Sequence, residues 1–301
     1  MGTPAFAAAS LKALLDAGHE LCGVYTQPDK PKGRGHKLAF SEVKTLALQY
    51  NLPVYQPKTL REEAVAEEIR NLKPELIAVV AYGKILPDSI LAIPPMGCVN
   101  IHGSLLPAYR GSAPIQHAVL NGEKYTGVCS MFMASEMDAG DIIFSASTEI
   151  GTYETASALF ERLAPMGAEL LLKTVEALRN GTAPRTPQNA DLVTFAPPLN
   201  KSLSPVDWHW SPEKIIHLIY GLQDWPCATT EFGGKSFRLF EARYTDTRTD
   251  KAPGSVLKAD KQGIEIACGE GRSLLILELQ DLDGGKRMAA SAWLLGHSLE
   301  V

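Results

Sequence analysis

Residues 98–111 read Cys-Val-Asn-Ile-His-Gly-Ser-Leu-Leu-Pro-Ala-Tyr-Arg-Gly and are the most informative stretch of the chain. The apolar segment 98–102 predicts a strand that ends at Gly103. Successive side chains of a strand alternate between its faces, so Asn100 and His102 share one face. Open α/β sheets bind ligands beyond the carboxyl ends of their strands, and this is where the pair lies. A carboxamide and an imidazole placed there could donate hydrogen bonds to an oxyanion and carry a proton.

Predicted strands and helices alternate around this stretch, which is typical of a doubly wound α/β domain. The continuous apolar run 76–81 indicates a buried parallel strand. Residues 126–134 and 141–148 are two further predicted strands. A long helix follows from Thr155 to about Arg179, with a bend expected at Pro165. Shorter predicted elements are a strand at 20–26 and helices at 11–15, 41–50 and 62–72, with a further helix starting at 112–114.

The chain changes character after residue 179. Residues 180–204 are rich in proline and polar side chains, which indicates a linker between domains. One helix is predicted at 212–221, followed by short strands at 237–240, 255–257, 263–267 and 274–279. Several short strands separated by turns suggest a small β-barrel at 205–301. This part carries eleven Lys and Arg against fourteen Asp and Glu.

Composition sets further limits. A net charge of −5 with 45% hydrophobic residues is that of an ordinary globular protein, and no apolar run reaches the length of a membrane span. The five cysteines are scattered, so we expect free thiols in a reducing cytoplasm and no metal site. The Gly-x-Gly-x-x-Gly pattern of dinucleotide-binding oxidoreductases is absent. We expect a monomer, although nothing in the sequence fixes the oligomeric state.

One local segment runs against the acidic average. Residues 29–37, Asp-Lys-Pro-Lys-Gly-Arg-Gly-His-Lys, hold four cations with two glycines and a proline. This composition predicts a flexible basic loop that is neither helix nor strand. Such a loop is more often a solvated surface feature than a binding site. A nucleic-acid partner stays possible because phosphate contacts depend on local charge.

The combined motifs resemble the formyltransferase family that uses 10-formyltetrahydrofolate. They are Asn-x-His-Gly-Ser-Leu-Leu-Pro at 100–107, Tyr-Arg-Gly at 109–111 and Met-Asp-Ala-Gly-Asp at 137–141. An Asn-x-His pair alone is more often a polar strand end, and an Asp before Ala-Gly is more often a turn residue. Their combination, over nearly the whole chain, favours catalysis. The resemblance implies a Rossmann-like catalytic domain at 1–179 and an OB-like, tRNA-binding barrel at 205–301.

The resemblance further implies transfer of a formyl group from 10-formyltetrahydrofolate to the amino group of methionyl-initiator tRNA, in translation initiation. In this reaction a neutral amine attacks the formyl carbon, and negative charge develops on the formyl oxygen. Asn100 is the candidate donor to that oxygen. His102 is the candidate second donor and proton carrier, and Asp138 would orient it. The residues expected to contact tRNA are Lys30, Lys32, Arg34 and Lys37.

The folate donor would lie against the loop that follows the 98–102 strand. Two leucines and a proline offer a rigid apolar wall for its flat rings. Ile85 and Leu86, in the loop after the 76–81 strand, are expected to form the opposite wall. The first wall consists of Ser104, Leu105, Leu106 and Pro107.

The sequence also departs from the family. Family members have an apolar strand directly before Met-Gly-Thr-Pro, and this sequence begins at that methionine. Neighbouring strands without it would keep unpaired backbone groups, at about 1–3 kcal/mol each. We therefore expect in-frame upstream codons for a Val- and Ile-rich segment. Residues 220–226 depart from the usual Asn-Pro-Trp-Pro pattern and receive no functional role.

Two other acceptors fit the same chemistry. The formyl group could pass to an amino sugar, or to water in a formyltetrahydrofolate hydrolase. The basic loop and the second domain argue against both, because small acceptors need neither. A purely RNA-binding module would not need the Asn100, His102 and Asp138 constellation.

Overall fold

The computed structural model describes residues 1–32 and 37–299, and the chain divides into two compact units. Unit 1 contains residues 1–114, 125–148 and 160–197, and unit 2 contains residues 115–124, 149–159 and those from 198 onward. The expected linker is therefore divided, because 180–197 belongs to unit 1. No helix among the described residues combines the length and apolarity of a membrane span.

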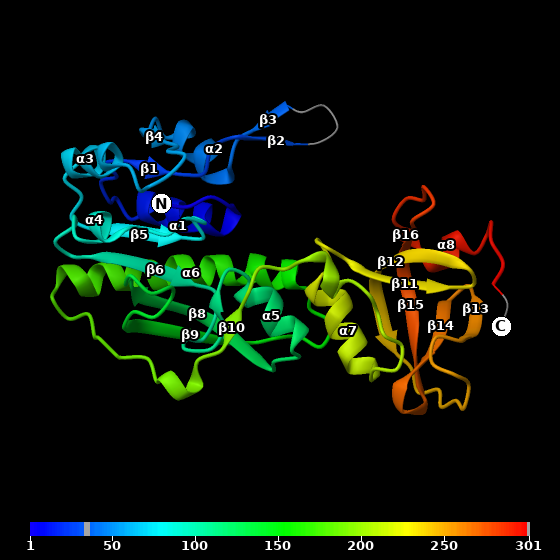
Figure 1. Ribbon diagram of the computed structural model, residues 1–301. Coiled ribbons are helices and arrows are strands. Elements are labelled where there is room, and N and C mark those ends of the chain that lie inside the picture. Colours follow the sequence, from blue (N-terminus) through cyan, green and yellow to red (C-terminus); the bar gives the residue numbers. More distant parts are fainter. Residues whose placement is uncertain (33–36, 300–301) are drawn as a thin grey trace. The chain divides into compact units, whose positions relative to one another are not determined.

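The main sheet of unit 1 has the order β5-β6-β8-β9 (Figure 1). β5 (Ile77–Val80) runs parallel to β6 (Cys98–His102), and β8 (Tyr125–Phe132) runs antiparallel to β6. β9 (Ile142–Glu149) forms the edge. Most residues of β5, β6 and β8 are buried, as expected for apolar strands covered on both faces. The strand predicted at 98–102 is confirmed.

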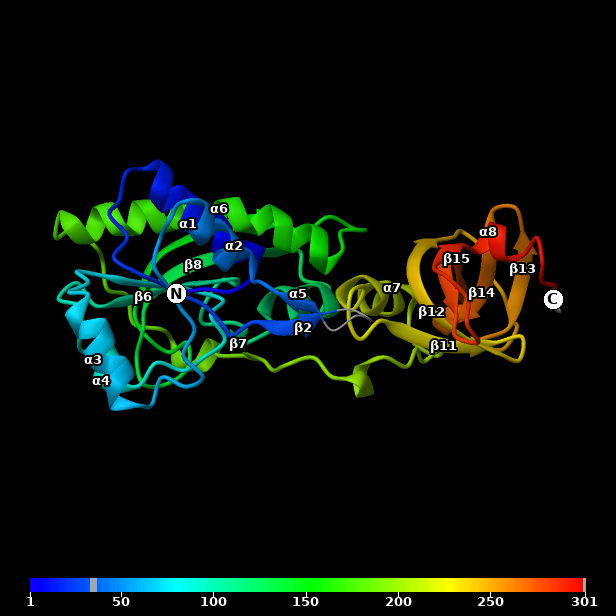
Figure 2. The ribbon, with the colours of Figure 1, turned by 90° about the horizontal axis from the view of Figure 1, so that it is seen from above.

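Two helices fix which way β6 faces. α1 (Ala5–Asp16) and α6 (Ala156–Arg179) lie side by side in Figure 2, and the rings of Phe6 and Phe160 are 5.3 Å apart. A Cβ added at Gly167 of α6 would lie 3.0 Å from Cγ2 of Ile101, so Ile101 faces this helix. Asn100 and His102 flank Ile101 in the strand and therefore face the opposite side. α6 continues through Pro165.

The remaining helices of unit 1 follow local signals. α2 (Glu42–Gln49) begins after Ser41, whose hydroxyl accepts a hydrogen bond from the Lys44 amide at 3.0 Å. This cap satisfies an otherwise free donor at the start of the helix that was predicted at 41–50. α3 (Glu63–Asn71) and the short α4 (Asp88–Leu91) pack with buried residues of β5 in one apolar cluster.

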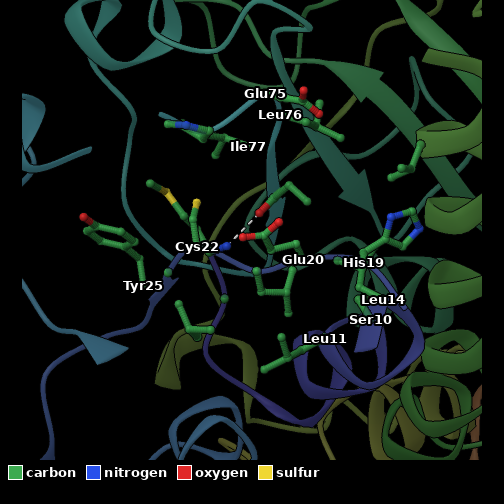
Figure 3. Close-up of a pocket in the computed structure, with 18 of the residues that line it drawn as sticks. Ser10, Leu11, Leu14, His19, Glu20, Cys22, Tyr25, Glu75, Leu76 and Ile77 are labelled. Carbon is green, nitrogen blue, oxygen red and sulfur yellow. Dashed lines mark hydrogen bonds between the residues drawn. The ribbon is translucent and has the colours of Figure 1, made fainter. Parts of the chain in front are cut away.

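A second, two-stranded sheet lies beside the first residues of the chain. β1 (Val24–Tyr25) pairs in parallel with β4 (Val54–Tyr55), so only part of the strand expected at 20–26 forms. Gly2 donates its N–H to the Tyr25 carbonyl at 2.9 Å, and Val80 donates to the Met1 carbonyl at 2.9 Å. Met1 and Gly2 thus lie between β1 and β5. Beyond the Met1 amine is a cavity of about 600 Å³, lined mainly by α1, β1 and β5 (Figure 3).

In a polypeptide that begins at Met1, the amine of this residue makes stability depend on pH. It donates a hydrogen bond to the Ala78 carbonyl at 2.7 Å. Burial lowers its pKa from 8.0 to about 6, because the charged form loses hydration. The unfolded chain therefore binds this proton more tightly than the folded protein does. The resulting loss of stability is complete at pH values below the folded-state pKa. We expect the free energy of unfolding to rise by about 2–3 kcal/mol as the pH increases from the folded to the unfolded pKa.

Urea unfolding at both ends of this pH window tests the expectation. The matched control is the same polypeptide with an acetylated Met1, whose amide does not titrate. His217, whose pKa burial also lowers, contributes equally to both proteins and cancels in the comparison. An identical pH dependence with and without the acetyl group would contradict the assignment to Met1.

Unit 2 is built on one antiparallel sheet with the order β11-β12-β15-β14-β13, and β16 pairs with β15. α7 (Pro212–Gly221) spans the predicted bounds and begins after Ser211, whose hydroxyl accepts from the Lys214 amide. No pairing among the described residues joins β11 to β13, so the path is open and the expected barrel is not confirmed. The elements are β11 (Ala228–Phe232), β12 (Lys235–Tyr244), β13 (Val256–Asp260), β14 (Gly263–Cys268), β15 (Arg272–Asp281), β16 (Met288–Ala289) and α8 (Ala290–Trp293).

Two segments that precede residue 198, 115–124 and 149–159, belong to unit 2 and pack closely within it. α5 (Pro114–Leu120) approaches α7 so closely that a Cβ added at Gly221 would lie 2.6 Å from Cγ of Leu120. Only glycine leaves room at that contact. Tyr153 packs its ring against those of Tyr220 and Tyr244, at 6.2 and 5.6 Å.

Candidate active site

The three residues predicted for catalysis lie in one region of unit 1. Asn100 and His102 project from β6, where Asn100 lies between Val79 of β5 and Met131 of β8. Asn100 is partly exposed, and its carboxamide makes no hydrogen bond within residues 1–32 and 37–299. Its two N–H groups are therefore available to a ligand on that face.

The His102 ring is buried and held from both of its nitrogens. Nε2 lies 2.8 Å from the Tyr109 carbonyl, and Nδ1 lies 3.7 Å from Oδ2 of Asp138. A carbonyl oxygen can only accept a hydrogen bond, so Nε2 carries a proton and donates a hydrogen bond to the Tyr109 carbonyl. The separation from Asp138 is longer than a hydrogen bond, but it leaves the carboxylate beside Nδ1. Nδ1 is thus the nitrogen that can gain a proton.

The Asp138 carboxylate is fixed by the backbone around it. Its Oδ2 accepts a hydrogen bond from the Gly111 amide at 2.9 Å. Asp138 itself has a φ of 52°, a left-handed conformation that is uncommon for a residue with a Cβ. A Cβ added at Gly140 would lie 1.8 Å from the Phe132 carbonyl, so only glycine fits there. This explains the Asp-Ala-Gly pattern in the connection between β8 and β9.

The residues expected to line the folate site are only partly accessible. The Ser104 hydroxyl is buried and donates to the Ala108 carbonyl at 2.6 Å. Leu106 is 7% exposed and packs with Cys129 and Met131. Leu105 and Pro107 are half-buried. Of the four side chains, only those of Leu105 and Pro107 are accessible.

The two residues expected to form the opposite wall also differ in exposure. Leu86 is 2% exposed and belongs to the apolar cluster under β5, whereas Ile85 is 72% exposed. Their loop follows β5 and is tied to the Gln27 side chain, which donates to the carbonyls of Tyr82 and Gly83 at 3.0 and 3.1 Å. Ile85 alone offers an apolar surface to a ligand.

The basic segment is a hairpin, so the expectation of neither helix nor strand was wrong. β2 (Lys30–Lys32) pairs antiparallel with β3 (Lys37–Ala39), and Lys32 is opposite Lys37. A two-stranded ribbon has free edges, which explains why it accepts a proline. Lys30 is exposed, and Arg34 lies outside the described residues.

The base of this hairpin is anchored. Asp29 accepts hydrogen bonds from Lys44 at 2.5 Å and from Gln56 at 2.8 Å. The Lys44 ammonium holds the pKa of the Asp29 carboxyl below its usual range. Both partners in the ion pair are largely covered. The hairpin therefore leaves the domain from a fixed position.

Other common chemistries lack their residues. The described residues contain no cluster of His, Cys, Asp and Glu that could hold a metal ion. Cys129 lies under the loop, where burial raises the pKa of its thiol. A thiol kept protonated is a poor nucleophile, so Cys129 is not an attacking group.

Several supporting residues were not predicted from the sequence. Arg110 lay inside the quoted motif but received no role, although it is 7% exposed and reaches Gln188 and Glu136. Gln188 and Thr194 are in the expected linker, whose composition gives no sign of a site. They contact the loops around His102 and Asp138.

Family models match both parts of the chain. The formyl transferase model matches residues 1–175, and the model of the formyl transferase C-terminal domain matches residues 198–298. The chain belongs to the formyl transferase family. Within it, the chain is 44% identical over 300 residues to the methionyl-tRNA formyltransferase of Alkaliphilus oremlandii, covering 100% of this chain and 96% of that protein.

Solved structures of formyl transferase type share the fold. The N-formyltransferase of Helicobacter canadensis, solved with folinic acid and dTDP-3-aminofucose, superposes with a TM-score of 0.69. It is 17% identical, over 91% of this chain and 96% of that one. HypX of Aquifex aeolicus, solved with tetrahydrofolic acid, has a TM-score of 0.61 and 21% identity. That match covers 83% of this chain, which spans only 43% of the HypX chain.

Proposed function

We propose that the chain transfers a formyl group from 10-formyltetrahydrofolate to the amino group of methionyl-initiator tRNA. The observation that carries the proposal is the 44% identity, over the full chain, to a protein named methionyl-tRNA formyltransferase. The side chains of Asn100, His102 and Asp138 supply the chemistry that the transfer needs. Formylated methionyl-tRNA then serves translation initiation.

In this mechanism Asn100 donates a hydrogen bond to the formyl oxygen as negative charge develops there. Its carboxamide has no hydrogen-bond partner among the described residues, so no internal hydrogen bond is broken when Asn100 binds the substrate. His102 takes up the proton that the attacking amine releases and passes it to N10 of the donor, so that the bond between N10 and the formyl carbon breaks and tetrahydrofolate leaves. Nδ1 is the nitrogen that can accept the proton, and the Asp138 carboxylate at 3.7 Å stabilises the charge that results.

The formyl donor lies between the loops after β5 and β6. Ile85 and the half-buried pair Leu105 and Pro107 offer apolar surfaces to its rings. Backbone groups of 103–107 supply polar contacts, since the Ser104 hydroxyl is already occupied. The tetrahydrofolic acid in the HypX structure and the folinic acid in the Helicobacter canadensis structure support a folate as the formyl donor.

The tRNA acceptor is bound by the basic hairpin and by unit 2. The hairpin cations attract phosphates, and the base of the hairpin is anchored at Asp29. Unit 2 has the short antiparallel strands from which OB-like barrels are built, and we propose that it adopts this architecture and contacts the tRNA.

Direct assay tests the proposal. Purified protein with 10-formyltetrahydrofolate should formylate methionyl-tRNA, whereas a UDP-amino sugar or water alone should give turnover at least about a hundredfold lower. Preferential formylation of the sugar, or rapid release of formate without an acceptor, would replace the proposal by one of the two alternatives.

The hairpin makes a separate prediction. Lys30→Ala combined with Arg34→Ala should raise KM for methionyl-tRNA at least about tenfold, because two charged contacts to phosphate are lost. The salt dependence of kcat/KM should weaken by about two counterions, while KM for the formyl donor stays unchanged. The control, Lys12→Ala with Lys173→Ala, removes equal charge elsewhere in unit 1. Equal losses in both double variants would show that only net charge matters.

A further inference from the structure

Residues 188–196 lie against both loops that hold the His102 ring. The Gln188 carboxamide makes four hydrogen bonds to these loops. Its Nε2 donates to the carbonyls of Asp138 and Gly140, each at 2.8 Å. Its Oε1 accepts from Nε and Nη2 of Arg110, at 3.1 and 2.9 Å. One side chain thus joins the Asp138 loop to the loop after β6.

Thr194 holds the other loop. Its hydroxyl accepts a hydrogen bond from the Tyr109 amide at 2.9 Å, and its carbonyl accepts from the Arg110 amide at 2.9 Å. From there the chain continues as β10 (Phe195–Ala196), which pairs in parallel with β7 (Arg110–Gly111). The segment is therefore bonded to the site at both of its ends.

Each anchored loop contains a backbone that needs external support. Tyr109 has a φ of 64° and Asp138 a φ of 52°, and residues with a Cβ rarely adopt such values unless their surroundings impose them. These two residues supply the groups on either side of the ring, the Tyr109 carbonyl at Nε2 and the Asp138 carboxylate at Nδ1. The support for both comes from residues 188–196.

We propose that residues 188–196 form a strap that positions the His102–Asp138 pair, with Gln188 as its main positioning residue. The segment is more than a connection between domains, because it fixes the backbone on both sides of the imidazole. The role in catalysis rests on the proposed formyl transfer. The structural role, in which Gln188 restrains the Asp138 loop, does not.

The strap predicts a selective loss of kcat. Gln188→Ala removes all four hydrogen bonds, and Gln188→Glu keeps an acceptor for Arg110 but loses both donors to the Asp138 loop. Both variants should lower kcat for formyl transfer by about 10–100-fold, with KM for either substrate within about twofold of the parent. Asn200→Ala is the matched control, because Asn200 lies outside the strap and, among the described residues, its side chain bonds only to Ser202 in its own turn. It should leave kcat unchanged.

A double-mutant cycle with Asp138→Ala separates positioning from general damage. If Gln188 acts through Asp138, adding Gln188→Ala to Asp138→Ala should cost less than about twofold. Multiplicative losses, or a normal kcat in both Gln188 variants, would overturn the proposal. Amide hydrogen exchange provides a readout without activity. The amides of residues 138–140 should exchange at least about tenfold faster in Gln188→Ala than in Asn200→Ala.

The two proposals can fail separately. If the parent protein does not formylate methionyl-tRNA, the proposed function fails, and exchange alone decides whether the strap exists. If the parent is active but the amides of 138–140 exchange equally fast in Gln188→Ala and in the control variant Asn200→Ala, the strap proposal is wrong and the proposed function stands. Gln188→Glu keeps these tests usable should the alanine variant unfold, since it conserves the shape of the side chain.

Discussion

His102→Ala is expected to lower kcat for formyl transfer to methionyl-tRNA by about 10²–10⁴. The attacking amine must lose a proton, and in the proposed mechanism its base is the buried imidazole of His102, which β6 places beside Asp138. The substitution removes both the base and the partner of the Tyr109 carbonyl. Steady-state assays with saturating donor and tRNA measure the effect. KM should change little, because the group acts as the bond forms.

The control for His102 is another imidazole next to a carboxylate. His209 lies 2.8 Å from Oδ1 of Asp207 in unit 2, and both side chains are exposed. His209→Ala should leave kcat within about twofold of the parent. A His102→Ala protein that folds normally and keeps more than about a tenth of the parent kcat would remove His102 from the mechanism.

Asn100→Ala is expected to lower kcat by about 10²–10³, the usual effect of losing one donor to a developing oxyanion. The carboxamide faces the same side of β6 as His102 and has no partner among the described residues. Stability should change little, since no internal hydrogen bond is lost. The thermal midpoint, measured beside kcat, therefore separates a catalytic effect from unfolding.

Asn100→Asp sharpens this test, because it keeps the shape but replaces the donor by a negative charge. It should be at least as impaired as Asn100→Ala, since the carboxylate repels the charge on the formyl oxygen. An aspartate variant as active as the parent would show that Asn100 does not serve as a donor.

Local patterns predicted much of unit 1 and α7. The alternation of polar and apolar residues in β6 placed Asn100 and His102 on one face, and Ser41 marked the start of α2. These features depend on residues close together in the sequence. The folate roles of 104–107 and the tRNA roles of the hairpin remain predictions.

Contacts between residues far apart in the chain could not be predicted from the sequence. The pairing of β7 with β10 joins two strands of two residues each, too short for any periodic pattern. Gln188 reaches Asp138 across fifty positions, from a segment whose composition indicates only a linker. The two short strands of the basic segment pair with each other as a hairpin. Its glycines and proline gave no indication of this pairing. β11 was missed entirely.

The position of Met1 has a practical consequence for recombinant work. Anything fused to its nitrogen enters the space between β1 and β5, where side chains such as Leu11, Leu14 and Ile77 line the walls (Figure 3). A polyhistidine purification tag attached there directly would have to place its hydrophilic side chains against these apolar walls, at a cost in stability.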